Sequence, residues 1–134
     1  MNLTTNCPCG RNDARGRALT YTACCGRWLD AATPAPDAES LMRSRYTAFV
    51  LERGDYLLAS WHSSTRPPRI DFEPGVKWLG LEVRWQEQAD AAHAQVEFVA
   101  RQRGRTGSAI RLHERSRFVN EQGHWFYVDG DMLP

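Results

Sequence analysis

His93-Ala94-Gln95-Val96-Glu97-Phe98-Val99-Ala100 opens the stretch 93–103, in which apolar residues occupy every second position. Successive side chains of a β-strand point to opposite faces, so this spacing places Ala94, Val96, Phe98 and Ala100 together on one face. The stretch therefore predicts a strand with one face turned toward a core.

Three further strands are predicted around this one, over residues 76–86, 108–119 and 124–129. The residues expected on their apolar faces are Leu79, Leu81, Val83 and Trp85 in the first, Ile110, Leu112, Ser116 and Phe118 in the second, and part of the run Trp125 to Val128 in the last. Residues 104–107 and 121–123 contain the glycines typical of hairpin turns. The sequence thus predicts a meander of antiparallel strands.

The part of the chain before these strands has helical spacing. Apolar residues recur at three- and four-residue steps from Leu41 to Val50, and Asp37 is placed to act as the N-cap. We expect Gly54 to end this helix and Asp55 to cap a second one, which stops before a pair of prolines. Helices followed by long antiparallel strands predict an α+β fold.

All four cysteines of the chain, Cys7, Cys9, Cys24 and Cys25, lie in its first 25 residues. Four thiolates arranged as two close pairs can form the tetrahedral all-sulfur site that Zn²⁺ prefers in structural roles, with no coordination position left open for chemistry. The spacing therefore predicts a zinc knuckle, and the predicted metal ligands are these four residues.

Two alternatives to zinc are a disulfide framework and a redox pair. Disulfides are typical of exported chains, whereas the first residues here have neither a basic region nor an apolar one. A redox pair usually has the spacing Cys-x-x-Cys, which is absent. Both arguments favour zinc, and we expect a cytoplasmic protein that does not enter a membrane.

Two domains are expected, residues 1–30 as the knuckle and residues 31–134 as the α+β domain. The stretch 31–36 contains two prolines, which block a helix and favour an extended connection. The remaining length is enough for a single hydrophobic core.

Cys7-Pro8-Cys9-Gly10 together with Cys24-Cys25 resembles the SEC-C zinc motif found at the C-terminus of the secretion ATPase SecA. The stretches 41–50, 55–57, 61–62, 114–118 and 125–130 resemble the YchJ-like family of uncharacterised bacterial proteins, which pairs a SEC-C motif with a domain similar to nuclear transport factor 2 (NTF2). The resemblance implies zinc as the cofactor. It also implies a cone, in which helices pack on a curved antiparallel sheet that leaves an opening.

The loop between the cysteine pairs departs from the family pattern. Cys9 and Cys24 are separated by 14 residues, against roughly eight in the usual SEC-C loop. The resemblance therefore implies the four ligands but not the geometry of the loop, and it implies no specific function.

Glu114 has the parity of Leu112, Ser116 and Phe118, and is expected on the apolar side of its strand. An unpaired carboxylate in the opening of a cone is suited to proton transfer. The alternative is an ion pair with Arg43 or Arg45 of the first helix. If the cone is open, the residues predicted to line it are Tyr46, Trp61, His62, Glu114 and Trp125.

The formal net charge is only +1, but the arginines are unevenly distributed. Five of them share one parity on the second and third predicted strands, namely Arg101, Arg103, Arg111, Arg115 and Arg117. They are expected to line one exposed sheet face, which would suit phosphates or an acidic partner. A solvated sheet face is the alternative interpretation.

Three functions are compatible with these features. The leading hypothesis is a non-enzymatic interaction module that docks a protein or ribosomal partner through the knuckle. The second is a small-molecule binding site or an acid–base enzyme that uses the pocket around Glu114. The third is RNA binding through the arginine face, which predicts an affinity that falls steeply with salt. The oligomeric state cannot be predicted from the sequence.

Overall fold

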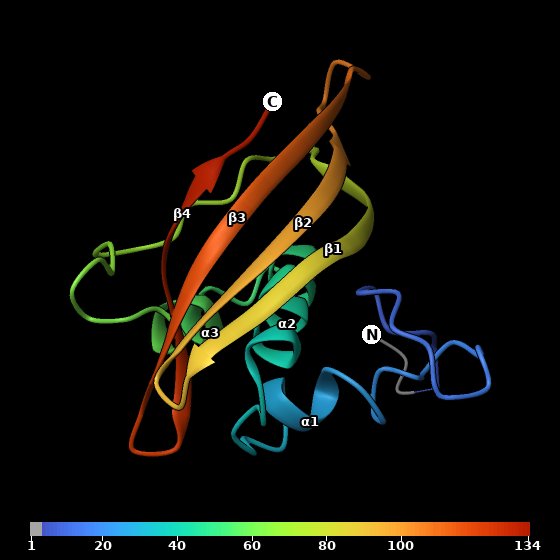
Figure 1. Cartoon of the computed structure of the whole chain (residues 1–134). Helices are drawn as coiled ribbons and strands as arrows, with labels where there is room; N and C mark the ends of the chain where they lie inside the picture. Colours follow the sequence, from blue (N-terminus) through green and yellow to red (C-terminus); the bar gives the residue numbers. More distant parts are fainter. Residues whose placement is uncertain (1–3) are drawn as a thin grey trace.

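The computed structural model describes residues 4–134, and its centre is a twisted antiparallel sheet of four strands in the order β1-β2-β3-β4 (Figure 1). The strands are β1 (Lys77–Asp90), β2 (His93–Arg103), β3 (Ala109–Glu121) and β4 (His124–Met132). Three helices precede them, α1 (Gly26–Leu29), α2 (Ala38–Val50) and α3 (Gly54–Ala59). The α+β fold predicted from the sequence is confirmed.

Helix α2 begins where the sequence predicts. The side chain of Asp37 accepts a hydrogen bond of 2.7 Å from the backbone N–H of Ser40, as an N-cap does. The second helix differs from its prediction, because α3 starts at Gly54 and has no side-chain cap. Asp55 lies in the first turn of α3, where its carboxylate binds the guanidinium of Arg53 instead.

Strand β1 corrects one prediction about side-chain faces. Its pairing with β2 is irregular between Trp78 and Gly80 and again between Val83 and Trp85. Each irregularity adds a residue to one strand and reverses the alternation beyond it. Leu79 and Trp85, predicted to face the core, are therefore 42% and 37% exposed. Trp78 packs instead against Phe49 of α2.

The hydrophobic core lies between α2 and one face of the sheet. Helix α2 contributes Leu41, Met42 and Tyr46, and the sheet contributes Val96 and Phe118. The same cluster of buried residues includes all four cysteines together with Tyr21, Trp28 and Leu29 from the N-terminal segment. The knuckle and the sheet therefore share one core, which is joined through α2.

No helix within residues 4–134 has both the length and the apolar character needed to cross a bilayer.

Candidate functional site

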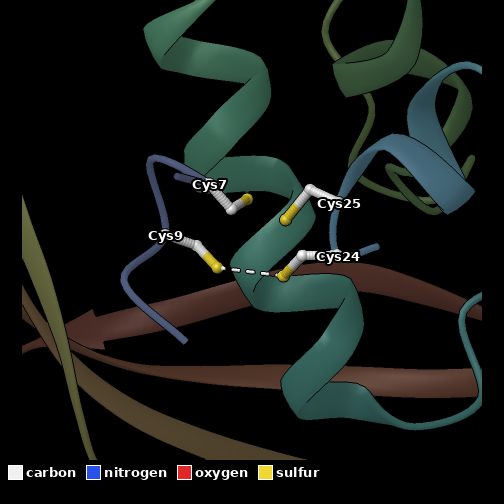
Figure 2. A group of neighbouring side chains, drawn as sticks. All are labelled: Cys7, Cys9, Cys24 and Cys25. Atoms are coloured by element: carbon white, nitrogen blue, oxygen red, sulfur yellow. Dashed lines mark hydrogen bonds between the residues drawn. The ribbon is translucent and has the colours of Figure 1, made fainter. Parts of the chain in front are cut away.

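The four cysteines converge on one point beside α2 (Figure 2). Their sulfur atoms all lie within 4.8 Å of one another, and the Sγ atoms of Cys9 and Cys24 are 3.6 Å apart. All four side chains are buried. The fold thus brings together the segments 7–9 and 24–25, which lie at the two ends of the intervening loop, and their sulfurs form one closed group.

Short-range backbone contacts hold these two segments in place. The N–H of Cys7 donates to the carbonyl of Leu19, and Gly10 adopts a left-handed φ of 76° as the chain turns after Cys9. After Cys25, Gly26 packs closely on Tyr21: a side chain at position 26 would lie 2.8 Å from the Tyr21 carbonyl oxygen. The glycines that follow the cysteines therefore permit the turns of the site.

Two side chains of α2 form hydrogen bonds with the cysteines. The hydroxyl of Thr47, which is completely buried, donates to the Cys25 sulfur at 3.3 Å and lies 3.7 Å from the Cys7 sulfur. Arg43 donates to the carbonyl oxygen of Cys9 at 3.0 Å and forms an ion pair with Glu39. Hydrogen bonds from such neighbours orient metal ligands and stabilise their negative charge.

Hydrogen bonds among the thiols shift the pKa values of the four cysteines in opposite directions. Those involving Cys24, Cys25 and Cys9 hold the pKa of Cys7 far below its usual range. Those involving Cys24 and Cys25 lower the pKa of Cys9 to about 7. The pKa of Cys25 is raised, first by its hydrogen bond with Cys24. The lowered pKa values of Cys7 and Cys9 favour their thiolate forms, which are the forms that bind a cation.

The sulfur positions fit a zinc ion. In a tetrahedral site with Zn–S bonds of about 2.3 Å, the sulfurs are about 3.8 Å apart. The Cys9 and Cys24 sulfurs are 3.6 Å apart, close to this value, and no two of the four sulfurs are more than 4.8 Å apart. The donor set would close all four positions of the metal, leaving none for a substrate.

A second feature is a cavity of about 310 Å³ between α2 and the sheet. Aromatic and aliphatic side chains form most of its wall, and its polar side chains include Arg45, Glu114 and Ser116. The remaining lining residues are Met42, Tyr46, Phe49, Trp61, Trp78, Phe98, Ala100, Gln102, Leu112, Phe118, Tyr127 and Met132. Its size lies at the lower end of the range of small-molecule sites, about 300 to 1,000 Å³.

Arg45 is an unusual component of this wall because it is a buried cation. Its side chain donates from Nη1 to the Leu57 carbonyl and the Ser60 hydroxyl, at 2.8 and 2.7 Å. The guanidinium packs against the rings of Trp61 and Tyr127, 4.9 and 4.7 Å from their centroids, and these two rings also contact each other edge to face. Burial lowers the pKa of Arg45 to about 10.

Glu114 faces the cavity, on the face predicted from its parity. Its Oε2 atom accepts hydrogen bonds from the hydroxyls of Ser116 and Tyr127. Neither Arg43 nor Arg45 forms an ion pair with it in the described part of the chain; the two arginines bind Glu39 and backbone or hydroxyl oxygens. The expected ion pair is thus replaced by two neutral hydroxyl donors.

Three of the five residues predicted to line the pocket are brought together there, Tyr46, Trp61 and Glu114. His62 does not line the cavity, because its ring is engaged near the surface by Ser64 and Glu121. Trp125 does not line it either and is buried elsewhere in the core.

The predicted arginine face is a surface of mixed charge. Arg101, Arg115 and Arg117 pair with the carboxylates of Glu82, Glu97 and Asp129 on neighbouring strands. Arg115 also stacks on the exposed Trp85. Arg103 and Arg111 are exposed and have no ion pair within residues 4–134. Acidic side chains therefore interrupt the basic stripe.

Sequence reasoning did not identify Thr47 or Trp78 as parts of these sites, and it considered Arg45 only as a partner of Glu114. Thr47 has no pattern that marks it as a neighbour of the cysteines, because only the fold brings it to Cys25, 22 residues earlier. Trp78 was missed because the irregular pairing of β1 changes its face.

A twisted antiparallel sheet over helices, joined to a buried group of four cysteines, defines an NTF2-like protein with a SEC-C motif. A model of the middle NTF2-like domain of YchJ matches residues 37–130. The chain belongs to this YchJ family.

Curated relatives and solved structures agree with this assignment. A UPF0225 protein of Polaromonas sp. is 70% identical over 127 residues, covering 93% of this chain and 91% of its own length. A UPF0225 protein of Bordetella pertussis is 55% identical, covering 94% of this chain and 92% of its own length.

Two solved SEC-C motif proteins are similar over nearly the whole chain. The solution structure from Rhodopseudomonas palustris has a TM-score of 0.80 at 31% identity, covering 97% of this chain and all of that one. The crystal structure from Psychrobacter arcticus has a TM-score of 0.79 at 30% identity, covering 98% and 85%.

Proposed function

We propose that this protein is a zinc-stabilised binding module in which one Zn²⁺, held by Cys7, Cys9, Cys24 and Cys25, fixes the N-terminal segment against α2. The observation that carries this proposal is the closed group of four buried sulfurs. A metal with four thiolate ligands has no open position, so its role is structural and not catalytic.

Metal analysis of the untagged protein, purified without chelators, tests this proposal. We expect one zinc per chain and no thiol reactive toward a chromogenic disulfide reagent until a chelator is added, after which four thiols should react together. Four freely reactive thiols in protein without metal would contradict it. Cys9→Ser should lose the metal, whereas Ser63→Ala, outside the site, should keep it.

A protein or ribosomal partner is expected to dock on the knuckle. The cysteines are buried, so the surface available for docking is the loop between Cys9 and Cys24. Arg15 and Arg17 are exposed at a turn held by the carboxylate of Asp13, which accepts both backbone N–H groups. A variant with Arg15→Ser and Arg17→Ser should keep its zinc but sediment less with ribosomes. Unchanged sedimentation would remove this loop as a ribosome-docking surface.

A small-molecule site is the second candidate function. It is supported by the cavity, whose walls are apolar but which is bordered by the buried Arg45 and by Glu114. A largely apolar pocket with a few polar groups is the usual form of a ligand site. The cavity and the cysteines involve different residues, so ligand binding and metal content can be measured separately.

A further inference from the structure

The guanidinium of Arg45 is buried beside an apolar cavity, and one of its edges has no hydrogen-bond partner in the described chain. We infer that this cavity binds an organic carboxylate with an aromatic body and one hydrogen-bond donor. The inference deepens the small-molecule function proposed above and rests on it. Arg45 would hold the carboxylate, and Glu114 would accept the donor.

The first step is the free edge of Arg45. Only Nη1 has hydrogen-bond partners within residues 4–134, so Nε and Nη2 are without one there. Yet no buried side-chain nitrogen or oxygen in that part of the chain lacks a partner. Nε and Nη2 must therefore border open space, and the cavity is the open space that Arg45 lines.

This edge is the one that suits a carboxylate. Nε and Nη2 of a guanidinium are parallel donors whose spacing matches the two oxygens of a carboxylate. Arg53 of the same protein uses these two atoms to hold both oxygens of Asp55, at 3.1 and 3.3 Å. Arg45 has no such partner in the described chain, although the residue is only 7% exposed.

The second step is that the guanidinium is held in place before any ligand arrives. Two acceptors fix Nη1, and the adjoining rings of Trp61 and Tyr127 pack against the guanidinium. A donor fixed in this way loses little freedom on binding. Desolvation also makes the unpaired charge costly, and an anion would offset that cost.

The third step concerns Glu114, which limits the class of ligand. Its Oε2 is occupied by the hydroxyls of Ser116 and Tyr127, while Oε1 has no hydrogen-bond partner within residues 4–134. By the same reasoning Oε1 is accessible, and it can accept from an O–H or N–H group. The carboxylate of Glu114 also repels a second negative charge, so a ligand with several anionic groups is disfavoured.

The apolar wall supplies the rest of the recognition. Phe49, Trp78 and Phe98 also line the cavity, and Phe98 is the cross-strand partner of Glu114. Edge-to-face and stacked contacts with these rings favour an aromatic ligand over an extended aliphatic one.

Indole-3-acetate is a suitable probe because it combines an aromatic body, a carboxylate and one N–H donor. Its affinity should be compared by titration calorimetry with that of indole-3-acetamide, which lacks the charge, and 1-naphthaleneacetate, which lacks the donor. We expect indole-3-acetate to bind about 10- to 100-fold more tightly than the amide, as charge-assisted bidentate hydrogen bonds would give. The naphthalene acid should bind with intermediate affinity.

Three variants separate the contributions. Arg45→Met should remove the preference for the carboxylate while binding of the amide persists. Glu114→Gln should reduce the advantage of indole-3-acetate over 1-naphthaleneacetate, because an amide oxygen is a weaker acceptor for the indole N–H than a carboxylate. Ala100→Phe, which places a ring in the cavity, should abolish binding of all three probes.

If Arg45→Met does not fold, the comparison of the acid with the amide on wild-type protein decides the question alone. Equal affinities of wild-type protein for the acid and the amide would overturn the carboxylate inference but leave the small-molecule site. Absence of binding of every probe at about 5 mM, weaker than specific ligands usually bind, would overturn both. Neither result affects the zinc proposal, which metal content tests separately.

Discussion

Thr47 connects the fold to the cysteine cluster through a single hydroxyl. It donates to the Cys25 sulfur from a side chain with no exposed surface. We expect Thr47→Val, which has nearly the same shape, to weaken zinc binding by about tenfold, the lower end of the usual effect of such neighbours. Competition with a chromophoric zinc chelator measures this change.

Thr47→Ser is the matched control for this prediction. Serine keeps the hydroxyl and loses only a methyl group, so zinc affinity should stay near that of the wild type. If both variants weaken zinc binding equally, packing and not the hydrogen bond accounts for the effect.

Glu114 illustrates how far single residues can be predicted. Its face follows from the alternation of β3, which the sequence contains. Its partners do not, because Tyr127 reaches it from β4 and the pairing of these strands is shifted near Phe118. The sequence instead suggested an arginine, since a buried carboxylate usually has a cationic partner.

Among the elements, β1 shows the limit of periodicity. The existence of all four strands could be predicted. A glycine within the strand, Gly80, marks the first bulge, but no such residue marks the second one between Val83 and Trp85, and each bulge reverses the faces beyond it. The cysteine cluster was the easier prediction, because its ligands are defined by residue type and short spacing. The full set of residues that line the cavity could not be predicted from the sequence, because they come from α2 and several strands and meet only in the folded chain.

Substitution of the two tryptophans of β1 tests which side chains of this strand face the core. Trp78 packs on Tyr46 and Phe49, with ring centroids 5.5 and 5.8 Å apart. Trp78→Ala should therefore lower the free energy of unfolding by about 2 to 4 kcal/mol. Trp85→Ala loses mainly a contact with Arg115 at an exposed position and should cost about 1 kcal/mol or less.

Urea denaturation of both variants checks this difference. Equal losses, or a larger loss for Trp85→Ala, would mean that the faces of β1 are as the simple alternation predicts.

The pairing of β2 and β3 gives a prediction about pH. Hydrogen bonds from Arg115, and then from His113, lower the pKa of the Glu97 carboxyl. A lowered pKa in the folded state means that the unfolded chain binds more protons, so stability is gained as pH rises. This contribution is present above the ordinary pKa of glutamate and is lost as pH falls through the lowered value.

Glu97→Gln should accordingly be less stable than the wild type at pH 7, with a difference that shrinks as the pH is lowered below about 4. Thermal unfolding between neutral and acid pH measures the two curves. A difference independent of pH would show that the substitution acts through packing.

At the scale of the whole molecule, the knuckle and the sheet share a core. A metal that binds only the folded chain stabilises it by mass action. We therefore expect chelation to lower the Tm of the sheet as well as that of the knuckle, in a single transition.

Tryptophan fluorescence and circular dichroism during heating, with and without chelator, would follow both parts. A sheet signal that melts at the same temperature in both conditions would mean that the knuckle unfolds separately. Cys9→Ser should behave as the chelated wild type does.

The order of the strands also has a kinetic consequence. Each strand pairs with its neighbour in the sequence, so the sheet closes through successive hairpins, and short loops cost little entropy to close. The knuckle, by contrast, must reach α2 across separations such as the 40 residues between Cys7 and Thr47. Proteins rich in local contacts fold faster, and we therefore expect the hairpins to form first and zinc to bind late in folding. Zinc should then slow the rate of unfolding more than it raises the rate of folding.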